Sequence, residues 1–210
     1  MTTLSPTPRS TVQRGKKRAV TSRDELYSVL DAGLICHLAV DVDGAPIVLP
    51  TAYGRDGDTL YIHGSTGARS LREAITGKPV CVAVTLVDGV VYARSVFHHS
   101  MNYRSAVIHG IAQPAEDEVR GLRAIVAQSS PGSWEYARTP TPKEMAKTAV
   151  LAIDLTEASV KIRTGGPGDD AEDIEADTVW AGVLPLHTSW GVPVTDNGHA
   201  VPAHVSERGR

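Results

Sequence analysis

The sequence has little of what would tie it to a membrane, a disulfide framework or a cysteine-based metal site. Its two cysteines, Cys36 and Cys81, are too few for a disulfide framework, and neither has a CxxC partner. The apolar run at residues 34–40 is far too short to span a bilayer, and the first residues lack the apolar core of a signal peptide. We therefore expect a cytoplasmic protein without a membrane partner.

An excess of charge of one sign is also lacking. The 210 residues carry 21 Lys and Arg against 24 Asp and Glu, so no global positive field is available to drive nucleic-acid binding. The basic cluster at residues 14–18 could be a nucleic-acid tail, but without interleaved aromatics a solvated arm is the simpler interpretation. We expect no nucleic-acid partner, and any bound phosphate must be held by a local site.

What is present is an ordinary globular composition, with 41% hydrophobic and 21% charged residues, which predicts one folded domain with appendages. Residues 1–20 are rich in Ser, Thr, Pro and basic residues and are expected to form a flexible arm. Residues 21–163 carry the periodic patterns of the folded domain. Residues 164–210 are expected to form a C-terminal extension with an acidic linker, a docking segment near 179–186 and a flexible tail.

Hydrophobic periodicity within this domain predicts mostly strands. Short apolar or alternating runs indicate strands at 34–40, 46–53, 59–63, 80–87, 90–97, 103–112 and within 149–160. The Asp88-Gly89 pair between two of these runs predicts a hairpin turn. Helices are predicted at 21–33, 70–76, 116–128 and from Pro142. Strands joined mostly by hairpins favour a mainly β fold, a closed or nearly closed antiparallel barrel with a few helices.

The segment from Leu60 to Arg72 is the most informative one for chemistry. It has the pattern of a strand, a small-residue turn and a helix, which can present backbone N–H groups to an anion, and Arg69 adds a phosphate partner. The alternative is an ordinary capping box of Ser70 and Glu73, and the residues alone leave both interpretations open. A Walker A loop is missing, and the glycines at 165–168 do not form a GxGxxG fingerprint.

The eight histidines do not form a metal motif. Adjacent residues of a strand point to opposite faces, so His98 and His99 cannot share one ion, and HExxH is absent. His37 and His109 are each alone in an apolar strand, where a structural role is expected. His63 differs because it ends a strand just before the glycine-containing turn. A serine nucleophile is disfavoured because no GxSxG elbow is present.

Three blocks, at residues 45–53, 60–72 and 102–112, carry a family resemblance. In this order they resemble the pyridoxamine 5'-phosphate oxidase-like FMN-binding split-barrel superfamily, and most of all its flavin-nucleotide-binding branch, which includes nitroimidazole-resistance proteins. A weaker likeness extends the match over about residues 23 to 186. The resemblance implies a six-stranded antiparallel split barrel that forms a homodimer, with FMN in a groove between the subunits.

The resemblance also implies roles for individual residues. The first block would form the wall of the flavin ring, with Val48, Leu49, Pro50, Thr51 and Tyr53. The second block would hold the ribityl-phosphate, with His63, Gly64, Ser65, Arg69 and Ser70. His63 would lie beside the flavin, which makes it the candidate catalytic residue, although a structural strand-end role is an open alternative. Trp180 would either cover the flavin or pack on the barrel.

One departure from the family bears on the reaction. The vitamin-B6 oxidases place Arg and Lys after Ser in the phosphate block, whereas Ala68-Arg69-Ser70 stands here, and their C-terminal arginine and histidine motif is missing. Oxidation of pyridoxamine phosphate is therefore not expected. The expected activity is reduction of a small acceptor, a nitro compound or quinone, by a small-molecule electron donor. The alternative is a flavin- or haem-binding carrier or sensor without turnover of its own.

Overall fold

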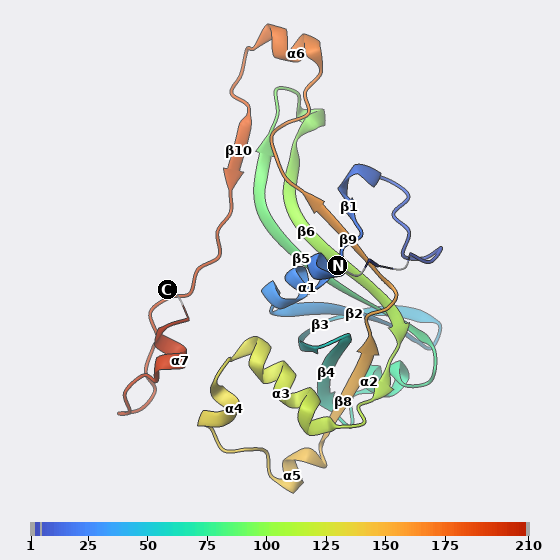
Figure 1. Ribbon diagram of the computed structural model, residues 1–210, viewed down its shortest axis with the longest axis vertical. Coiled ribbons are helices and arrows are strands. Elements are labelled where there is room, and N and C mark those ends of the chain that lie inside the picture. The colour runs from blue at the N-terminus through green and yellow to red at the C-terminus, as the bar shows by residue number, and fades with distance from the viewer. Residues whose placement is uncertain (1–2, 5, 209–210) are drawn as a thin grey trace.

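The structure, a computed structural model, describes residues 3–4 and 6–208. It contains one 10-stranded sheet with the order β1-β9-β6-β5-β2-β3-β4-β8-β7, and β10 pairs with β5 (Figure 1). All pairings are antiparallel. The mainly β antiparallel barrel is thereby confirmed, whereas the six strands implied by the family resemblance are exceeded by short strands at the edges and by β10.

The strands are β1 (Ala19–Val20), β2 (Ile35–Val42), β3 (Ala45–Asp56), β4 (Thr59–Ser65), β5 (Pro79–Tyr92), β6 (Ser100–Ile111), β7 (Gln113–Pro114), β8 (Thr148–Asp154), β9 (Ala158–Arg163) and β10 (Gly182–Pro185). The α-helices are α1 (Arg23–Ala32), α2 (Arg69–Ala74), α3 (Glu118–Ser129), α4 (Ser133–Tyr136), α5 (Pro142–Met145), α6 (Ala171–Ala176) and α7 (Ala203–Ser206). Two 3₁₀ helices are η1 (Lys16–Arg18) and η2 (Val96–His98). None of the described helices is long and apolar enough to cross a membrane.

The sheet curls into a barrel because β3 changes partner along its length and because the chain of β6 continues into β7 at the other end of the sheet order. β3 pairs with β2 through residues 45–52 and then with β4 through residues 53–56. β6 pairs with β5 and β9, and its direct continuation β7 pairs with β8 at the other end of the sheet order. The change of partner within β3 leaves a split in the barrel wall between β3 and the end of β4.

The interior of the barrel is filled by one large apolar cluster, to which α1 and α2 contribute. Its fully buried members include Leu26, Leu30, Leu38, Tyr53, Leu60, Ile62, Ile108 and Ile153. A second, smaller cluster forms where α3 covers β4 and β8, with Tyr61, Leu122, Ile125 and Val150. Gly54 permits this packing, because a Cβ at that position would come within 2.3 Å of the backbone of Ala124 in α3.

The predicted hairpin at Asp88-Gly89 is wrong. β5 runs through both residues to Tyr92, and the register shifts between Val87 and Gly89 show a β-bulge there. Glycine is needed at this bulge for a different reason from a turn: a Cβ on Gly89 would lie 2.8 Å from the carbonyl oxygen of Leu184 in β10. The pair of residues therefore lets a third strand approach closely.

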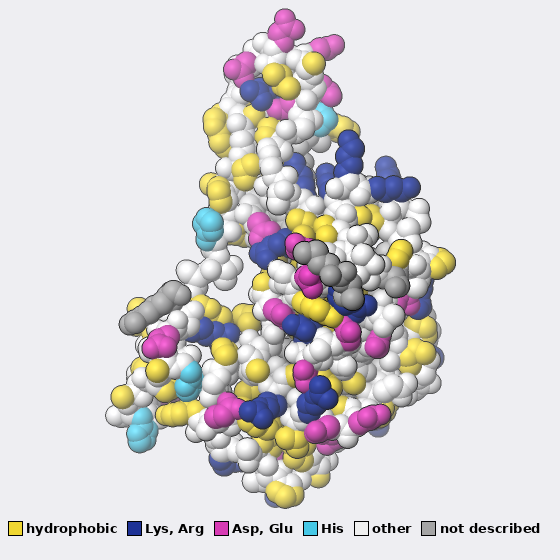
Figure 2. Space-filling model, in the orientation of Figure 1, with side chains coloured by type: hydrophobic (Ala, Val, Ile, Leu, Met, Phe, Trp, Pro, Cys, Tyr) yellow, Lys and Arg dark blue, Asp and Glu magenta, His cyan; other side chains and the backbone are white. Residues whose placement is uncertain are grey.

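Beyond this bulge the β5–β6 hairpin leaves the barrel. Residues 88–101, together with residues 164–185 that lie against them, form a projection that we call the arm (Figure 1). Arg94 holds the arm together through ion pairs with Asp169 at 3.1 Å and Asp177 at 2.6 Å. The expected acidic linker contains α6 at the tip of the arm, where Figure 2 shows acidic side chains gathered, and the expected docking segment contains β10.

The segments at the two ends of the chain lie against other parts of the molecule. Near the N-terminus, Leu4 is buried, and Arg9 pairs with Glu157 at 2.6 Å. After β10 the chain runs as an extended segment, residues 186–201, that we call the strap, and α7 follows beside α4 (Figure 1). The flexibility expected for residues 1–20 and for the tail stays a prediction.

Candidate functional site

The split in the barrel leaves one edge of β3 open. Residues 45–51 pair with β2 on one side, and no strand of the described chain pairs with their other side. Their backbone N–H and C=O groups on that edge are available to a flat ligand with donors and acceptors on its rim. The open edge, the end of β4 and the turn before α2 border the split in the barrel wall, and we call this region the split groove.

Four of the five residues predicted as the flavin wall lie along this open part of β3. Val48 is 59% exposed and Pro50 shares its face, while Leu49 and Thr51 point to the other side of the strand. Tyr53 lies elsewhere: its side chain is fully buried in the barrel core, and its hydroxyl donates to the carbonyl oxygen of Leu30. Burial raises the pKa of Tyr53 far above its usual value, so this hydroxyl stays protonated.

The turn after β4 brings the predicted phosphate residues to one end of the split groove. Gly64 lets β4 approach α2, because a Cβ there would lie 2.6 Å from Leu71. The hydroxyl of Ser65 accepts a hydrogen bond from the Gly67 N–H at 3.2 Å and so shapes the turn. Arg69 is exposed and pairs with Asp43 in the β2–β3 turn.

The alternative capping box at this turn does not form. α2 begins at Arg69 with Ala68 as its N-cap, and no side chain caps it. Ser70 is therefore inside the first turn of the helix instead of at its cap. With only six residues, α2 contributes little dipole, so the positive charge at this end of the groove comes from the side chain of Arg69.

His63 lines a cavity of about 420 Å³ together with Leu122, Arg138, Glu144 and Thr148. Its Nδ1 atom is buried and has no hydrogen-bond partner in the described part of the chain. Burial lowers the pKa of His63 below its usual value, so the imidazole is neutral near pH 7. A neutral ring with an unpaired nitrogen suits coordination or hydrogen bonding to a ligand.

The opposite wall of this cavity comes from residues that the sequence did not single out. Arg138 binds both oxygens of Glu144, at 2.8 and 2.7 Å. Glu144 also accepts the Thr141 N–H in the capping box of α5, and these bonds hold the pKa of its carboxyl well below the usual range. The capping-box spacing from Thr141 to Glu144 was a readable signal for α5, but nothing in the sequence connected it with His63.

Trp180 is not brought to the split groove within one chain. It lies on the arm, 69% exposed, with its ring 5.7 Å from that of Tyr92. Figure 1 shows the arm projecting away from β3 and β4. No group of three or more potential metal-ligating His, Cys, Asp and Glu side chains occurs among the described residues.

The barrel, its split and the glycine-containing turn define a split-barrel protein, the class that the sequence blocks resemble. A family model described as pyridoxamine 5'-phosphate oxidase matches residues 22–162. This match spans more than half of the chain, which therefore belongs to that family. Among curated proteins, none matches the sequence.

Solved structures similar to the chain include two that span nearly all of it. The flavocytochrome Anf3 from Azotobacter vinelandii is 34% identical, with a TM-score of 0.90 and 98% coverage of both chains. The FAD and haem binding protein from Mycobacterium smegmatis is 40% identical, with a TM-score of 0.86, and the match covers 91% of this chain and 97% of that one. A protein described as a candidate 5-nitroimidazole antibiotic resistance protein, from Bacteroides thetaiotaomicron, shares the fold at 20% identity, a TM-score of 0.58, and coverage of 69% and 86%.

Proposed function

We propose that the chain is an oxidoreductase that binds a flavin in the split groove and a haem at His63. The observation that carries this proposal is the buried, unpartnered Nδ1 of His63 beside an open strand edge. Proteins that are 34% and 40% identical over nearly the whole chain are described as a flavocytochrome and as binding FAD and haem. A flavin supplies two-electron chemistry and a haem supplies one-electron chemistry.

The split groove fits a flavin. The open edge of residues 45–51 offers backbone donors and acceptors, and Val48 and Pro50 offer an apolar surface to a flat ring. At the end of the groove, Arg69 would bind phosphate in place of Asp43, an exchange that costs little because both side chains of the pair are exposed. The sequence resemblance favours FMN, whereas the 40% identical protein is described as binding FAD, and we propose FAD.

The cavity at His63 fits a haem ligand. An iron ligand must be a neutral imidazole, and the lowered pKa of His63 keeps it in that state near pH 7. Leu122 gives the cavity an apolar side, and the paired Arg138 and Glu144 close it with a neutral ion pair instead of an isolated charge. The residues around His63 therefore bind and orient a group, and they restrict water at the ring nitrogen.

The acceptor proposed for this oxidoreductase is a small molecule, a nitro compound or quinone, reduced at the expense of a small-molecule electron donor. A carrier or sensor that only holds its cofactors is the second candidate. We also propose that the protein is a homodimer. Val48, Pro50 and Ile35 form an exposed apolar face on β2 and β3 next to the groove, and such a face is seldom left open on a monomer.

The cheapest test is the absorption spectrum of the purified protein, followed by acid release and chromatography of the flavin. Two flavin bands and a Soret band are expected, and chromatography distinguishes FAD from FMN. His63→Ala should remove the Soret band and leave the flavin bands. His109→Ala, which changes a half-buried strand histidine outside the groove, is the matched control and should keep both. A protein without flavin bands would overturn the proposal, and a His63→Ala protein with an unchanged Soret band would move the haem elsewhere.

Turnover distinguishes the enzyme from the carrier. The pre-reduced protein is mixed with a panel of nitroimidazoles and quinones, and its reoxidation is followed per bound flavin. Reoxidation faster than that of free reduced flavin supports the oxidoreductase. If no acceptor reacts faster than with free reduced flavin, the carrier is the better assignment.

A further inference from the structure

The first part of the strap (residues 186–201) is held by contacts with its own chain at Leu186 and Trp190. At its upper end β10 pairs with β5, and the N–H of Leu186 donates to the carbonyl oxygen of Asp88 at 3.0 Å. Further along the strap, the Trp190 ring lies against the residue that follows α7: the guanidinium of Arg208 is 3.9 Å from the ring centroid, and Arg208 also donates to the carbonyl oxygen of Ser129. These contacts hold residues 186–190, and Val192 and Val194 follow directly beyond them.

The middle of the strap makes few contacts with its own chain. Val192 is 90% exposed and Val194 is 96% exposed, and the strap contains neither helix nor strand. Holding an extended residue in one conformation costs about 1–2 kcal/mol. Residues 193–201 share a cavity of about 350 Å³ with Ser133 and Tyr136 of α4, but the side chains of Val192 and Val194 still lack a covering surface.

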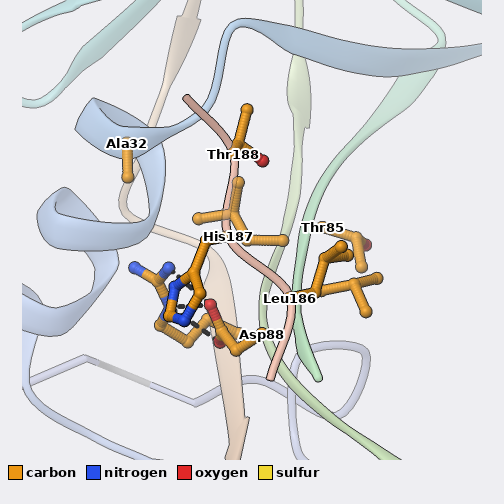
Figure 3. A pocket seen from close by; sticks show the side chains of 9 residues that line it. Ala32, Thr85, Asp88, Leu186, His187 and Thr188 are labelled. Atoms are coloured by element: carbon orange, nitrogen blue, oxygen red, sulfur yellow. Dashed lines mark hydrogen bonds and ion pairs between the residues drawn. The ribbon is translucent and has the colours of Figure 1, made fainter. Parts of the chain in front are cut away.

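The strap does not close onto its own barrel either. Between its upper end and β5 lies a cavity of 440 Å³, lined by Leu186, His187 and Thr188 on one side and by Thr85 and the Arg104–Asp88 ion pair on the other (Figure 3). Figure 2 shows the strap standing off from the barrel below this cavity. The space beneath the strap is open to another molecule.

The chain exposes more surface than a compact monomer of the same mass. The chain exposes 12860 Å², whereas a compact monomer of 22.3 kDa is expected to expose about 9400 Å². Each partner of a standard protein interface contributes about 800 Å². The excess surface of this chain is several times that contribution, which indicates an extensive interface instead of a single peptide or small ligand.

A second copy of this chain is the occupant that accounts for all the exposed surfaces together. Leu184 and Met101 expose an apolar face on the arm, and the register along β5 and β6 continues this face down to the bare barrel face at Ile35 and Val48. In a two-fold dimer the arm and strap of each copy contact the exposed barrel face of the other copy, so the same contact forms twice. We propose that the strap is an intersubunit clasp whose middle lies across the second copy.

This inference rests on the homodimer in the proposed function and adds the surface that holds it. The first test uses the purified holoprotein with the double substitution Val192→Asp and Val194→Asp. In a free chain these exposed positions accept aspartate without cost, whereas beneath a second copy two unpaired carboxylates would be desolvated. The dimer dissociation constant, measured by sedimentation, should therefore rise about a hundredfold or more.

The matched control is Val119→Asp, in the exposed first turn of α3, which should leave the dissociation constant unchanged. If the double variant dimerises with the same dissociation constant as the wild-type protein, the clasp is overturned but the dimer is not. A wild-type protein that is monomeric at every concentration would overturn both the clasp and the dimer. Flavin and haem absorbance, recorded on the same samples, tests cofactor binding separately, so failure of the clasp is distinguishable from failure of the proposed function.

A second measurement does not depend on a loss of binding. A photo-crosslinking benzophenone side chain at position 192 should give, on illumination of the purified protein, a covalent product of twice 22.3 kDa. The same side chain at position 119 should give none. Crosslinks that form only within one chain would overturn the clasp.

Discussion

The barrel and the clasp-like parts of the molecule, the arm and the strap, treat their apolar side chains in opposite ways. In the barrel, Leu30, Leu60 and Ile62 are fully buried by other residues of the same chain. On the arm, Val96 and Phe97 are each 87% exposed, and on the strap Val192 and Val194 are exposed even more. The barrel therefore buries its apolar side chains within one chain, whereas the arm and the strap leave apolar side chains exposed that only another molecule could cover.

This difference indicates that the barrel determines the stability of the fold, whereas the arm and strap determine the association of chains. A hydrophobic core substitution should destabilise the fold of one chain, while a substitution on the arm or strap should affect the association of two chains. The site lies between the two regions: the split groove belongs to the barrel, but the apolar face next to it belongs to the surface that remains bare.

The largest expected effect is in the barrel core. Leu60→Ala removes a fully buried side chain and should lower the free energy of unfolding by about 2–5 kcal/mol. Phe97→Ala on the arm is the matched control, and its exposed ring should change that free energy by less than about 0.5 kcal/mol. Urea unfolding of the apo-protein at several concentrations measures both. Equal losses in the two variants would break the comparison.

The next effect concerns the connection between the two regions. Gly89→Ala places a Cβ against the carbonyl oxygen of Leu184, and overpacking of this kind costs about 1–3 kcal/mol. We expect β10 and the strap to detach, which increases amide exchange in residues 182–186, while amides of β2 and β6 stay protected. Loss of protection throughout the barrel would show that the arm is part of the barrel's own stability.

The next prediction concerns Arg69, at the end of the split groove, and its effect on flavin binding. Arg69→Ala should weaken flavin binding about tenfold to a hundredfold, because a hydrogen bond to a charged group contributes about 1.5–3 kcal/mol. The control away from the groove is Arg123→Ala, because Arg123 is also an exposed arginine in an ion pair, in its case with Glu135. Flavin titration of the apo-proteins measures the effect, and unchanged affinity would remove Arg69 from the phosphate site.

Much of the barrel could be predicted from the sequence because its signals are local. The helix from Arg23 to Ala32 follows from its amphipathic pattern and from Gly33, and the alternation in β2 follows from burial of one face. The hairpin prediction at Asp88-Gly89 was wrong because it used a local turn signal. The glycine is required there by β10, a strand far along the chain that packs against the bulge. Long-range contacts decide such positions.

The candidate site was predictable only in part for the same reason. Val48 and Arg69 could be placed by resemblance to a family block, and they lie along and at the end of the split groove. Tyr53 is in the same block, but it lies on the inward face of β3, two residues after Thr51, and at the point where β3 pairs with β4 its side chain is enclosed in the core. The position of the Arg138–Glu144 ion pair near His63 depends on tertiary packing and cannot be predicted from the spacing of these residues in the sequence.

The pH dependence of stability tests His63 as a buried neutral group. Its pKa is below the usual 6.5, so as pH falls the unfolded chain takes up the proton first and the folded state loses stability. Glu144 in the same cavity does not titrate in this range, because Arg138 holds its pKa well below the usual value. Between pH 7 and pH 5 the apo-protein should lose more stability than the His63→Gln variant. Parallel pH profiles would show that His63 is freely solvated.

The smallest expected effect decides whether Tyr53 belongs to the barrel core or to the groove. Tyr53→Phe removes the hydroxyl that donates to Leu30, but the Leu30 carbonyl oxygen still accepts from Gln128 at 3.0 Å and from the Gly33 N–H at 3.3 Å. Because no buried acceptor is left unpaired, the loss in unfolding free energy should be about 1 kcal/mol or less. Flavin affinity should stay unchanged, since the ring is fully buried away from the open edge of β3. A variant with normal stability and weakened flavin binding would instead place the Tyr53 hydroxyl at the groove, as the family resemblance implied.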